Sequence, residues 1–286
     1  MKDSIGGYKL MEELGAGATA RVYRVREPDG GKVYALKYSA HINRLSAEAA
    51  ILKQVRHPCF PGWIEDGREG AGAYLVMEYV PGITLQRLME QYPAGMLEQM
   101  AAGIGQDVAR GLAYLHGCQP AYIYRDLKAA NVIITPEGRA RLVDLGAAVC
   151  AEGVQAESCR AGTYGYSAPE QFWEGIQITP ACDVYGLGKL LAFLLTGQDP
   201  GKPPYDTMEY CSRHCGIRRA FQQLLAKCLQ PDPQLRYPDA SFLLSKLEAL
   251  TAGKGCFRDK IRAKTGNRTP CRYIKCIWRS EYERIF

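Results

Sequence analysis

This sequence lacks the kinds of segment that would direct a chain into or across a membrane. No apolar run follows the charged residues of the N-terminus, so we expect no signal peptide. The most apolar stretch, residues 184–197, is interrupted by Lys189 and is too short to span a bilayer. Internal repeats and low-complexity tracts are missing as well. We therefore expect a soluble, cytoplasmic protein with a large core in one or two domains.

The eleven cysteines form no Cys-x-x-Cys pair. A disulfide framework is typical of short secreted chains, and this chain does not fit that class. Cys211, His214 and Cys215 lie close enough in sequence to suggest a metal site, but two further ligands would have to come from elsewhere. We interpret most of the cysteines as small buried hydrophobic residues.

The net charge of +6 is distributed unevenly along the chain. Residues 251–286 hold ten basic against three acidic residues, whereas residues 1–250 hold 26 basic against 27 acidic residues. Such a change in composition marks a domain boundary. We expect a folded domain over residues 1–250 and a basic C-terminal tail over residues 251–286.

The basic tail also carries regularly spaced apolar residues. Ile274, Ile277, Trp278, Tyr282 and Ile285 recur at helical spacing among basic residues. This pattern is typical of a short amphipathic helix that contacts a membrane surface or a partner protein. A disordered or loosely docked terminus is the alternative. We do not expect nucleic acid as a partner, and the sequence does not indicate an oligomeric state.

The arrangement of hydrophobic residues predicts an α+β fold with two lobes. The first eighty residues alternate like strands over 8–12, 21–25, 33–38 and 74–80, with one helix over 45–55. After residue 80, apolar residues three or four apart predict helices over 85–91, 97–115, 184–195, 217–228 and 240–250. We expect a small antiparallel sheet lobe with one main helix over about 1–80, a larger mostly helical lobe over about 81–250, and a cleft between them.

The most informative polar residues lie in a loop between short apolar segments. Asp126, Lys128 and Asn131 are followed by Asp144 within about twenty residues. Phosphoryl transfer needs such groups, because an acceptor orients a hydroxyl, a cation meets the phosphate and oxygen ligands hold Mg²⁺. A polar turn between strands is the alternative, and it does not explain why all four groups are present.

Two further features stand in the strand-rich region. Gly15 and Gly17 lie between two strands, where backbone amides could close over phosphates, although a tight hairpin would also explain them. Lys37 ends a strand, and Glu48 stands eleven residues later in the following helix. A strand lysine alone is usually a solubilising charge, but together the two residues favour a functional pair.

Taken together, these motifs resemble the protein kinase family over residues 8–250. Residues 162–170, Gly-Thr-Tyr-Gly-Tyr-Ser-Ala-Pro-Glu, resemble the end of an activation segment. The Tyr-Arg-Asp-Leu-Lys and Ala-Pro-Glu-Gln forms look most like the bacterial branch of eukaryotic-type serine/threonine kinases. The resemblance implies transfer of the γ-phosphate of ATP to Ser or Thr hydroxyls of protein substrates, with Mg²⁺ as cofactor and with autophosphorylation.

The resemblance also implies a role for each site residue. Lys37 would hold the α- and β-phosphates with its rotamer fixed by Glu48, and Asn131 and Asp144 would ligate Mg²⁺. Asp126 would orient the substrate hydroxyl and accept its proton, while Lys128 would lie against the γ-phosphate. The implied ATP-binding residues are Leu14, Gly15, Gly17, Val22, Ala35, Lys37, Met77, Glu78, Val80 and Ile133.

In the activation segment, the resemblance implies that Thr163 hydrogen-bonds to Asp126 and Lys128. A buried Glu170 would need a partner, which the family pattern supplies as Arg236. Asp183 would hold the backbone of the catalytic loop, in addition to any role as a helix N-cap. Arg125 would contact a phosphate on Ser158, because Cys159 occupies the usual phosphorylation site.

Four positions depart from the family pattern. Ala20 replaces a third glycine, which should stiffen the loop slightly without abolishing nucleotide binding. Tyr124 replaces a histidine and Leu145 replaces a phenylalanine, which we interpret as tolerated packing variants. Ala130 stands where some relatives carry an acidic residue, so no preference for arginine in the substrate can be inferred. The alternative functions are a nucleotide-binding pseudokinase or scaffold, and a small-molecule kinase of the same superfamily.

Overall fold

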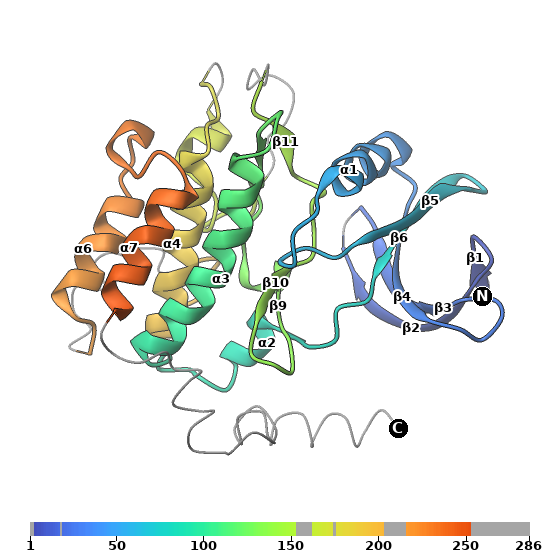
Figure 1. The fold of residues 1–286 in the computed structure, drawn as a ribbon, viewed down its shortest axis with the longest axis horizontal. Helices are drawn as coiled ribbons and strands as arrows, with labels where there is room; N and C mark the ends of the chain where they lie inside the picture. Colours follow the sequence, from blue (N-terminus) through green and yellow to red (C-terminus); the bar gives the residue numbers. More distant parts are fainter. Residues whose placement is uncertain (1–2, 18, 153–161, 174–175, 203–215, 253–286) are drawn as a thin grey trace. The chain divides into compact units, whose positions relative to one another are not determined.

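The computed structural model describes residues 3–17, 19–152, 162–173, 176–202 and 216–252 (Figure 1). The chain forms two compact units. The first comprises residues Met1–Val80 and Val143–Ala148, and the second comprises Pro81–Leu142 and Val149–Phe286. The short segment 143–148, which carries Asp144, therefore belongs with the N-terminal part of the chain although it lies more than sixty residues further along the sequence.

The first unit contains an antiparallel sheet with the strand order β1-β2-β3-β4-β6-β5. Its strands are β1 (Ser4–Ile5), β2 (Tyr8–Ala16), β3 (Arg21–Arg26), β4 (Val33–Ser39), β5 (Trp63–Glu69) and β6 (Gly72–Glu78). The predicted strands are confirmed, but β1 and β5 were not predicted. The sequence of β5, Trp-Ile-Glu-Asp-Gly-Arg-Glu, is mostly polar and charged, so it lacks the apolar alternation that marks a half-buried strand.

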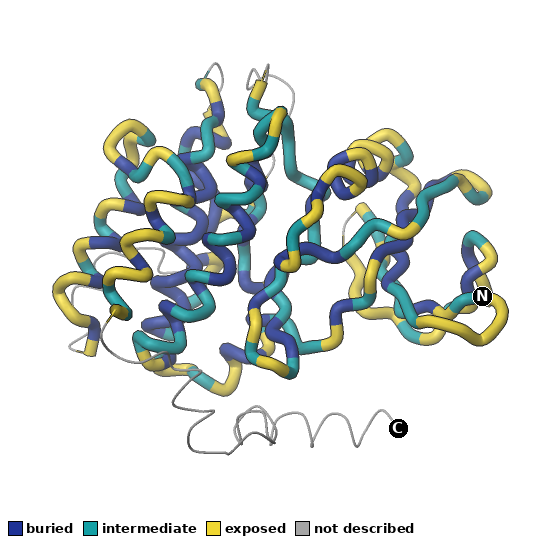
Figure 2. Tube along the Cα trace, in the orientation of Figure 1, coloured by how far each residue is buried: buried dark blue, intermediate teal, exposed yellow. Residues whose placement is uncertain are grey.

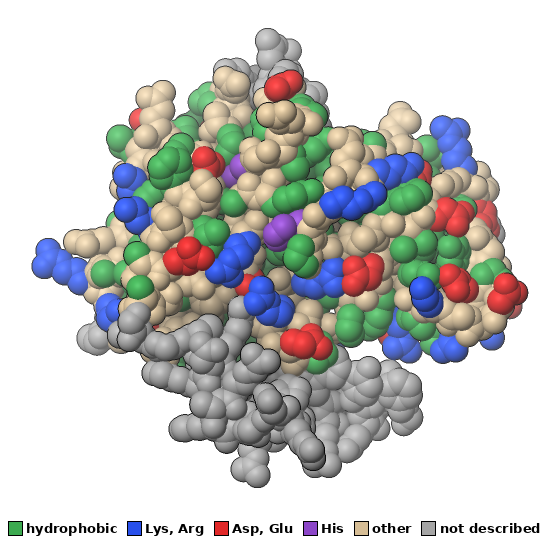
Figure 3. All heavy atoms as spheres, in the orientation of Figure 1, with side chains coloured by type: hydrophobic (Ala, Val, Ile, Leu, Met, Phe, Trp, Pro, Cys, Tyr) green, Lys and Arg blue, Asp and Glu red, His purple; other side chains and the backbone are tan. Residues whose placement is uncertain are grey.

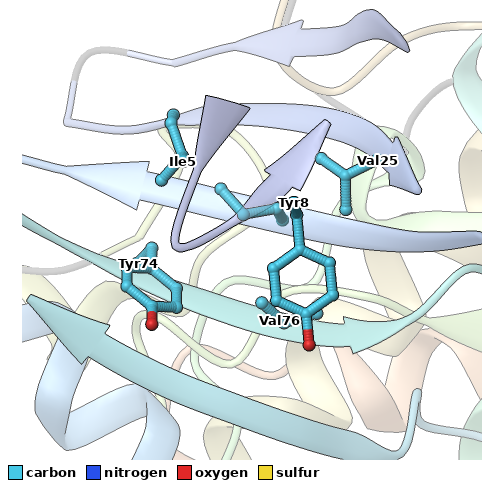
Figure 4. Packing of buried hydrophobic residues seen from close by; sticks show 6 residues of the cluster. Ile5, Tyr8, Val25, Tyr74 and Val76 are labelled. Carbon is cyan, nitrogen blue, oxygen red and sulfur yellow. The ribbon is translucent and has the colours of Figure 1, made fainter. Parts of the chain in front are cut away.

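One face of this sheet buries a compact cluster of hydrophobic residues (Figure 4). Its buried members are Ile5, Tyr8, Val25, Leu36, Tyr74 and Val76. The phenol groups of Tyr8 and Tyr74 donate to Glu65 of β5, at 3.1 and 2.9 Å. Burial, reinforced by Glu65, raises the pKa of both phenols to about 12, so both remain donors at neutral pH. Gly6 lies beneath the Tyr74 ring with a φ of 59°, a position that leaves no room for a side chain.

Helix α1 (Ile42–Gln54) completes the first unit and packs against β5 and β6. It begins three residues before the predicted start and ends one residue before the predicted end. Its buried residues are Leu45, Glu48, Ala49, Ile51 and Leu52. Because these positions recur every three or four residues, they form one face, and that face carries Glu48 inward with the hydrophobic side chains.

The second unit is mostly helical, as predicted. Its α-helices are α2 (Leu85–Met89), α3 (Glu98–His116), α4 (Ala181–Thr196), α6 (Arg219–Cys228) and α7 (Ala240–Thr251). Helix α4 is buried along almost its whole length (Figure 2), and even Lys189 is only 8% exposed. The most apolar stretch of the sequence is thus a central helix of a globular unit. Among the residues that the structure describes, no helix is long and apolar enough to cross a membrane.

Short strands frame the loop that carries Asp126. Strands β7 (Ile83–Thr84), β9 (Val132–Ile134) and β10 (Ala140–Leu142) form a small sheet in the order β10-β9-β7, and β8 (Tyr122–Ile123) pairs with β11 (Val149–Cys150). The loop runs from β8 to β9 through the 3₁₀ turn η1 (Ala129–Asn131). The buried Asp107 of α3 accepts a hydrogen bond from the backbone N–H of Ala140, which fixes β10 against the helical body.

The surface of the described residues carries charges of both signs. On the face drawn in Figure 3, basic and acidic side chains are interspersed with hydrophobic ones. The half-exposed pair of Arg110 and Glu248, at 2.8 Å, is one example. This agrees with the near-neutral balance of residues 1–250.

Candidate active site

In the first unit, one lysine contacts two carboxylates from separate segments. The ammonium of Lys37 on β4 donates to both oxygens of Glu48 on α1, at 3.0 and 2.8 Å. It also donates to Asp144 Oδ1 at 2.9 Å. The side chains of Lys37 and Glu48 are 12% and 5% exposed. The structure therefore brings together three of the residues that sequence analysis singled out.

The electrostatics of this cluster follow from its composition. Burial acts to lower the pKa of Lys37, but the charges of Glu48 and Asp144 outweigh burial and hold that pKa above its ordinary value. Burial raises the pKa of Glu48, and the charge of Asp144 adds to this rise while Lys37 opposes it. Two carboxylates share one ammonium, so the cluster keeps an excess of negative charge that suits a further cation.

Gly146 lies tightly against the three charged groups. A Cβ at this position would lie 3.0 Å from Asp144 Oδ1, 3.1 Å from Glu48 Oε2 and 3.2 Å from Lys37 Nζ. Its backbone N–H also donates to Asp144 Oδ1 at 2.8 Å. The sequence analysis did not assign a role to this glycine, because only the three-dimensional arrangement shows what a side chain there would displace.

The glycine-containing turn follows β2. The N–H of Gly17 donates to the carbonyl of Ala20 at 2.9 Å, so the turn is a tight connection between β2 and β3. A Cβ at Gly15 would meet nothing within 4 Å, and at Gly17 it would contact only the Ala20 carbonyl at 3.6 Å. Neither glycine is needed for the turn itself in this conformation, which leaves close approach of a ligand as a reason for them.

The remaining predicted ATP-binding residues are divided between the units. Ala35 and Met77 are paired across β4 and β6 and are buried, whereas Ile133 lies on β9 in the second unit. Leu14, Val22 and Val80 belong to the first unit together with Glu78. The backbone N–H of Glu78 already donates to the carbonyl of Gly62 at 2.8 Å. A contact of Glu78 with adenine would have to use another atom.

In the second unit, the carboxylate of Asp126 is hydrogen-bonded at both oxygens. Oδ1 accepts from the Thr163 hydroxyl at 2.7 Å, and Oδ2 accepts from Lys128 Nζ at 2.9 Å. The Asn131 amide donates to the Asp126 carbonyl at 2.9 Å and to Oδ2 at 3.2 Å. Lys128 also donates to Thr163 Oγ1 at 3.0 Å. The structure thus brings these four predicted residues into one hydrogen-bonded group.

The loop backbone just before Asp126 is held by Asp183, near the start of α4. Its carboxylate accepts the N–H groups of Tyr124 and Arg125, at 2.7 and 2.8 Å. The side-chain amide of Gln171 donates to the carbonyl of Arg125 at 2.9 Å. These bonds offset the left-handed conformation of Arg125, whose φ of 67° costs on the order of 1 kcal/mol for a residue with a Cβ. Gln171 was not identified from the sequence.

His116 extends this arrangement to a third helix. Its Nε2 lies 2.9 Å from Asp183 Oδ2, and its Nδ1 accepts the backbone N–H of Ala240 at 3.2 Å. Because Nδ1 accepts, the proton of the neutral ring must reside on Nε2 and point to Asp183. No local pattern in the sequence points to this residue, since its partners are 67 and 124 positions away.

Glu170 and Arg236 form a fully buried ion pair. The two guanidinium nitrogens of Arg236 donate to the two carboxylate oxygens of Glu170, at 2.5 and 2.8 Å, and the side chains are 1% and 0% exposed. The same guanidinium donates to the carbonyls of Gln230, Ala181 and Pro231. Every part of the pair is therefore hydrogen-bonded, as a buried ion pair requires.

Several predictions fall on parts of the chain that are not described. Ser158 and Cys159 lie outside the described residues, as do Cys211, His214 and Cys215 and the tail beyond Ala252. Arg125, the predicted reader of phosphorylated Ser158, is only 4% exposed. Among the described residues, no group of three or more His, Cys, Asp and Glu side chains is arranged to hold a metal ion.

Comparison with known proteins identifies the family. The model of the protein kinase domain matches residues 8–246. The chain is 29% identical over 271 residues to the brassinosteroid LRR receptor kinase BRI1 of Oryza sativa subsp. japonica. It is 28% identical over 265 residues to the serine/threonine-protein kinase PknL of Mycobacterium tuberculosis and 30% identical over 286 residues to the serine/threonine-protein kinase pkn2 of Myxococcus xanthus.

These alignments cover 90%, 85% and 87% of this chain, but only 24%, 65% and 34% of the respective relatives. The chain thus spans less than two thirds of the length of each. Bacterial members are among the relatives, as predicted, and so are plant receptor kinases. Protein kinases in general use ATP and a divalent metal ion. With the family model matched over most of its length, the chain belongs to the protein kinase family.

Proposed function

We propose that this chain transfers the γ-phosphoryl group of ATP to Ser or Thr hydroxyls of protein substrates, with Mg²⁺ as the metal ion. The observation that carries the proposal is the environment of Asp126. A hydroxyl, that of Thr163, lies at 2.7 Å from Asp126 Oδ1, and Lys128 lies at 3.0 Å from that hydroxyl oxygen. A substrate hydroxyl at the position of the Thr163 hydroxyl would point its proton at the Asp126 carboxylate, with the Lys128 ammonium next to its oxygen.

In this reaction, Asp126 would orient the substrate hydroxyl and take its proton as the oxygen attacks phosphorus. Its second oxygen is held by Lys128 and Asn131, so the carboxylate has one orientation. The ammonium of Lys128 would lie against the negative charge that develops on the transferred group. Positioning of this kind, rather than covalent chemistry by the protein, accounts for most of the catalysis in phosphoryl transfer.

The residues of the first unit have the chemistry needed to bind ATP. Lys37, held by Glu48 on a rigid helix, would bind the α- and β-phosphates. The turn with Gly15 and Gly17 has room above it for phosphate oxygens. The residues of this unit that would contact the adenine or ribose are Leu14, Val22, Ala35, Met77, Glu78 and Val80.

The chemistry of the donor set fits Mg²⁺. Asn131 directs its amide N–H groups to Asp126, which leaves the amide oxygen as its ligand atom. Asp144 contributes a carboxylate that a backbone N–H and Lys37 keep in place. Amide and carboxylate oxygens are ligands that Mg²⁺ takes. When bound, the ion neutralises charge on the phosphates; the orienting of Asp126 and Lys37 is done by the protein.

The proposal is tested by incubating the full chain with γ-labelled ATP, Mg²⁺ and casein. We expect labelled casein and labelled chain with the wild type. Asp126→Asn and Lys37→Met should each lower transfer by at least about a hundredfold. Asp232→Asn is the matched control, because Asp232 caps the 3₁₀ turn η4 (Pro233–Leu235) through the N–H of Gln234, which an Asn can also do.

Other outcomes would contradict the proposal. Nucleotide binding by the wild type without any transfer would identify a pseudokinase. Transfer to small hydroxyl or amine acceptors, with casein unlabelled, would identify a small-molecule kinase. Equal transfer by the wild type and Asp126→Asn would remove Asp126 from the reaction.

We also propose a cytoplasmic location and a membrane or partner contact for the basic tail. The tail's charge and its helical spacing of apolar residues support the contact. A shortened chain for comparison should end after Ala252, because α7 continues through Thr251, whose hydroxyl accepts from Gln106 at 2.9 Å. Binding of the full chain, and not the shortened one, to anionic vesicles would support the membrane contact; equal binding would contradict it.

A further inference from the structure

A carboxylate in the loop after α4 connects three segments of the second unit. Asp199 Oδ1 accepts from the Tyr166 phenol at 2.9 Å and from the Gly201 N–H at 3.0 Å. Its Oδ2 accepts from the side-chain amide of Gln86, on α2, at 3.3 Å. Asp199 belongs to no motif that sequence analysis identified, and its partners Gln86 and Tyr166 are 113 and 33 positions away.

Tyr166 belongs to the turn that carries Thr163. The N–H groups of Tyr166 and Ser167 both donate to the carbonyl of Thr163, at 3.1 and 3.0 Å, and the Ser167 hydroxyl accepts the N–H of Thr163 at 2.8 Å. The turn is therefore cross-linked by three hydrogen bonds of its own. Its first residue contacts Asp126 through the hydroxyl, and its fourth residue contacts Asp199 through the phenol.

The phenol of Tyr166 is a permanent donor in this position. The side chain is only 4% exposed. Burial, and next the charge of Asp199, raise the pKa of Tyr166 far above its ordinary value. A protonated phenol beside a carboxylate forms a charge-assisted hydrogen bond, which is stronger than a bond between neutral groups.

The backbones of the loop and the turn also meet directly. Gly165, with a φ of 86°, lies so close to the loop that a Cβ would stand 1.9 Å from the Pro200 carbonyl oxygen. Gly201 approaches the Tyr166 ring, since its Cβ would lie 3.7 Å from the ring edge. The loop thus contacts the turn through Gly165 and Tyr166, while Tyr164, between Thr163 and Gly165 in sequence, is 69% exposed.

From this geometry we infer that Asp199 is a positioning residue for phosphoryl transfer, acting through Tyr166 to set the turn that presents Thr163 to Asp126 and receives the substrate chain. The inference rests on the proposed kinase function. It assigns to Asp199 no contact with ATP and no part in the proton transfer. Its effect is expected on the protein substrate, because the turn carries the exposed residue next to Thr163.

The test compares steady-state kinetics of full-length variants with casein and with ATP as the varied substrate. Asp199→Ala and Tyr166→Phe should each raise the KM for casein about tenfold, the size expected for one lost charge-assisted hydrogen bond. The KM for ATP should stay within about twofold. Asp199→Asn, which keeps an acceptor oxygen but loses the charge, should raise the KM for casein only about threefold.

The double variant shows whether Asp199 acts through Tyr166. If it does, Asp199→Ala combined with Tyr166→Phe should again give about a tenfold rise, whereas independent effects would multiply to about a hundredfold. Asp232→Asn is the matched control, with no expected change in either KM. Circular dichroism and thermal unfolding of each variant report the folded fraction.

A purely structural role for Asp199 predicts a different result. Loss of folded enzyme lowers the apparent kcat and leaves both KM values unchanged. An unchanged KM for casein in Asp199→Ala, or a hundredfold rise in the double variant, would overturn the inference. Failure of the wild type to label casein at all would instead refute the proposed function, so the two failures are distinguishable.

Discussion

Two ion-paired groups among the described residues, Arg236 with Glu170 in the second unit and Lys37 with Glu48 and Asp144 in the first, differ in how completely their charges are matched. Arg236 and Glu170 pair one to one, and the surplus donors of Arg236 are taken by backbone carbonyls. Lys37 instead faces two carboxylates, Glu48 and Asp144, so one negative charge is left over. The first arrangement is complete without a ligand, whereas the second has two carboxylates for one ammonium, and the side chain of Asp144 is 39% exposed and open to a further cation. Burial alone therefore does not tell a structural pair from a functional one.

The largest expected effect comes from breaking the complete pair. Glu170→Ala leaves the Arg236 guanidinium buried beside carbonyl groups without its counter-charge, which should lower the free energy of unfolding by about 3–5 kcal/mol. Urea unfolding followed by circular dichroism measures this. Glu248→Ala, which removes the half-exposed partner of Arg110, is the matched control and should cost less than about 1 kcal/mol. Equal losses in the two variants would contradict the comparison.

Crowding the unmatched cluster should have a smaller effect on stability. In Gly146→Ala the new methyl group would press on Lys37, Glu48 and Asp144, and we expect a loss of about 1–3 kcal/mol in the free energy of unfolding. Gly103→Ala serves as control, because a Cβ there meets nothing within 4 Å and lies inside α3. That exchange should gain up to about 1 kcal/mol. The interpretation is contradicted if both alanine variants change the free energy of unfolding in the same direction.

The raised pKa of Glu48 predicts a dependence of stability on pH. A carboxyl whose pKa is higher in the folded than in the unfolded state binds more protons when folded between the two values. Its stabilising contribution is therefore full below the unfolded pKa and is lost as pH rises through the folded pKa. Wild type should accordingly lose stability relative to Glu48→Gln as pH rises through this window.

This pH effect is measured as the difference in unfolding free energy between wild type and Glu48→Gln at a series of pH values. A constant offset between the two would come from the lost ion pair, so only the slope bears on the pKa. If wild type instead gained stability relative to Glu48→Gln as pH rises, the charge of Lys37 and not burial would dominate the pKa of Glu48. Glu248→Gln, a change at a half-exposed glutamate, controls for charge removal in general.

The smallest effect on stability is expected from Lys53, in the last turn of α1. Lys53 contacts Asp66 at 2.7 Å and lies 5.0 Å from the centre of the Trp63 ring, but its side chain is nearly half exposed. Lys53→Ala should therefore cost only about 0.5–1 kcal/mol in the free energy of unfolding. Urea unfolding measures this as well. A loss as large as that of Glu170→Ala would show that this surface contact anchors the helix.

The sequence predicted those parts of the site that depend on local spacing. Lys37 and Glu48 were paired because the resemblance implies an acid in the helix that follows the strand lysine, and the two side chains are in contact. Asp126, Lys128 and Asn131 occur within one loop, so their proximity followed from their separation. The family pattern supplied the more distant Arg236. The predicted helices were found within a few residues because their apolar spacing is strong.

The residues that were missed depend on contacts between distant segments. His116 and Asp199 have no periodicity or neighbouring motif that indicates their role, and Gly146 and Gln171 stand beside recognised motifs whose pattern does not show what they contact. Strand β5 was missed because its polar composition hides the alternation; it is held in place by its pairing with β6 and its contact with α1. Ser158 and the basic tail lie outside the described residues, so the roles predicted for them stay predictions.

The ring of His116 joins three helices and the catalytic loop through its two nitrogens. The tautomer with its proton on Nε2 makes both contacts at once, because Nε2 donates to Asp183 while Nδ1 accepts from Ala240, and the other tautomer would lose both. The nitrogen chemical shifts of this imidazole in a magnetic resonance spectrum would therefore report, from a position away from Asp126, whether Asp183 still holds the loop. His116 could thus serve as a spectroscopic probe of the backbone at Tyr124 and Arg125, which Asp183 holds.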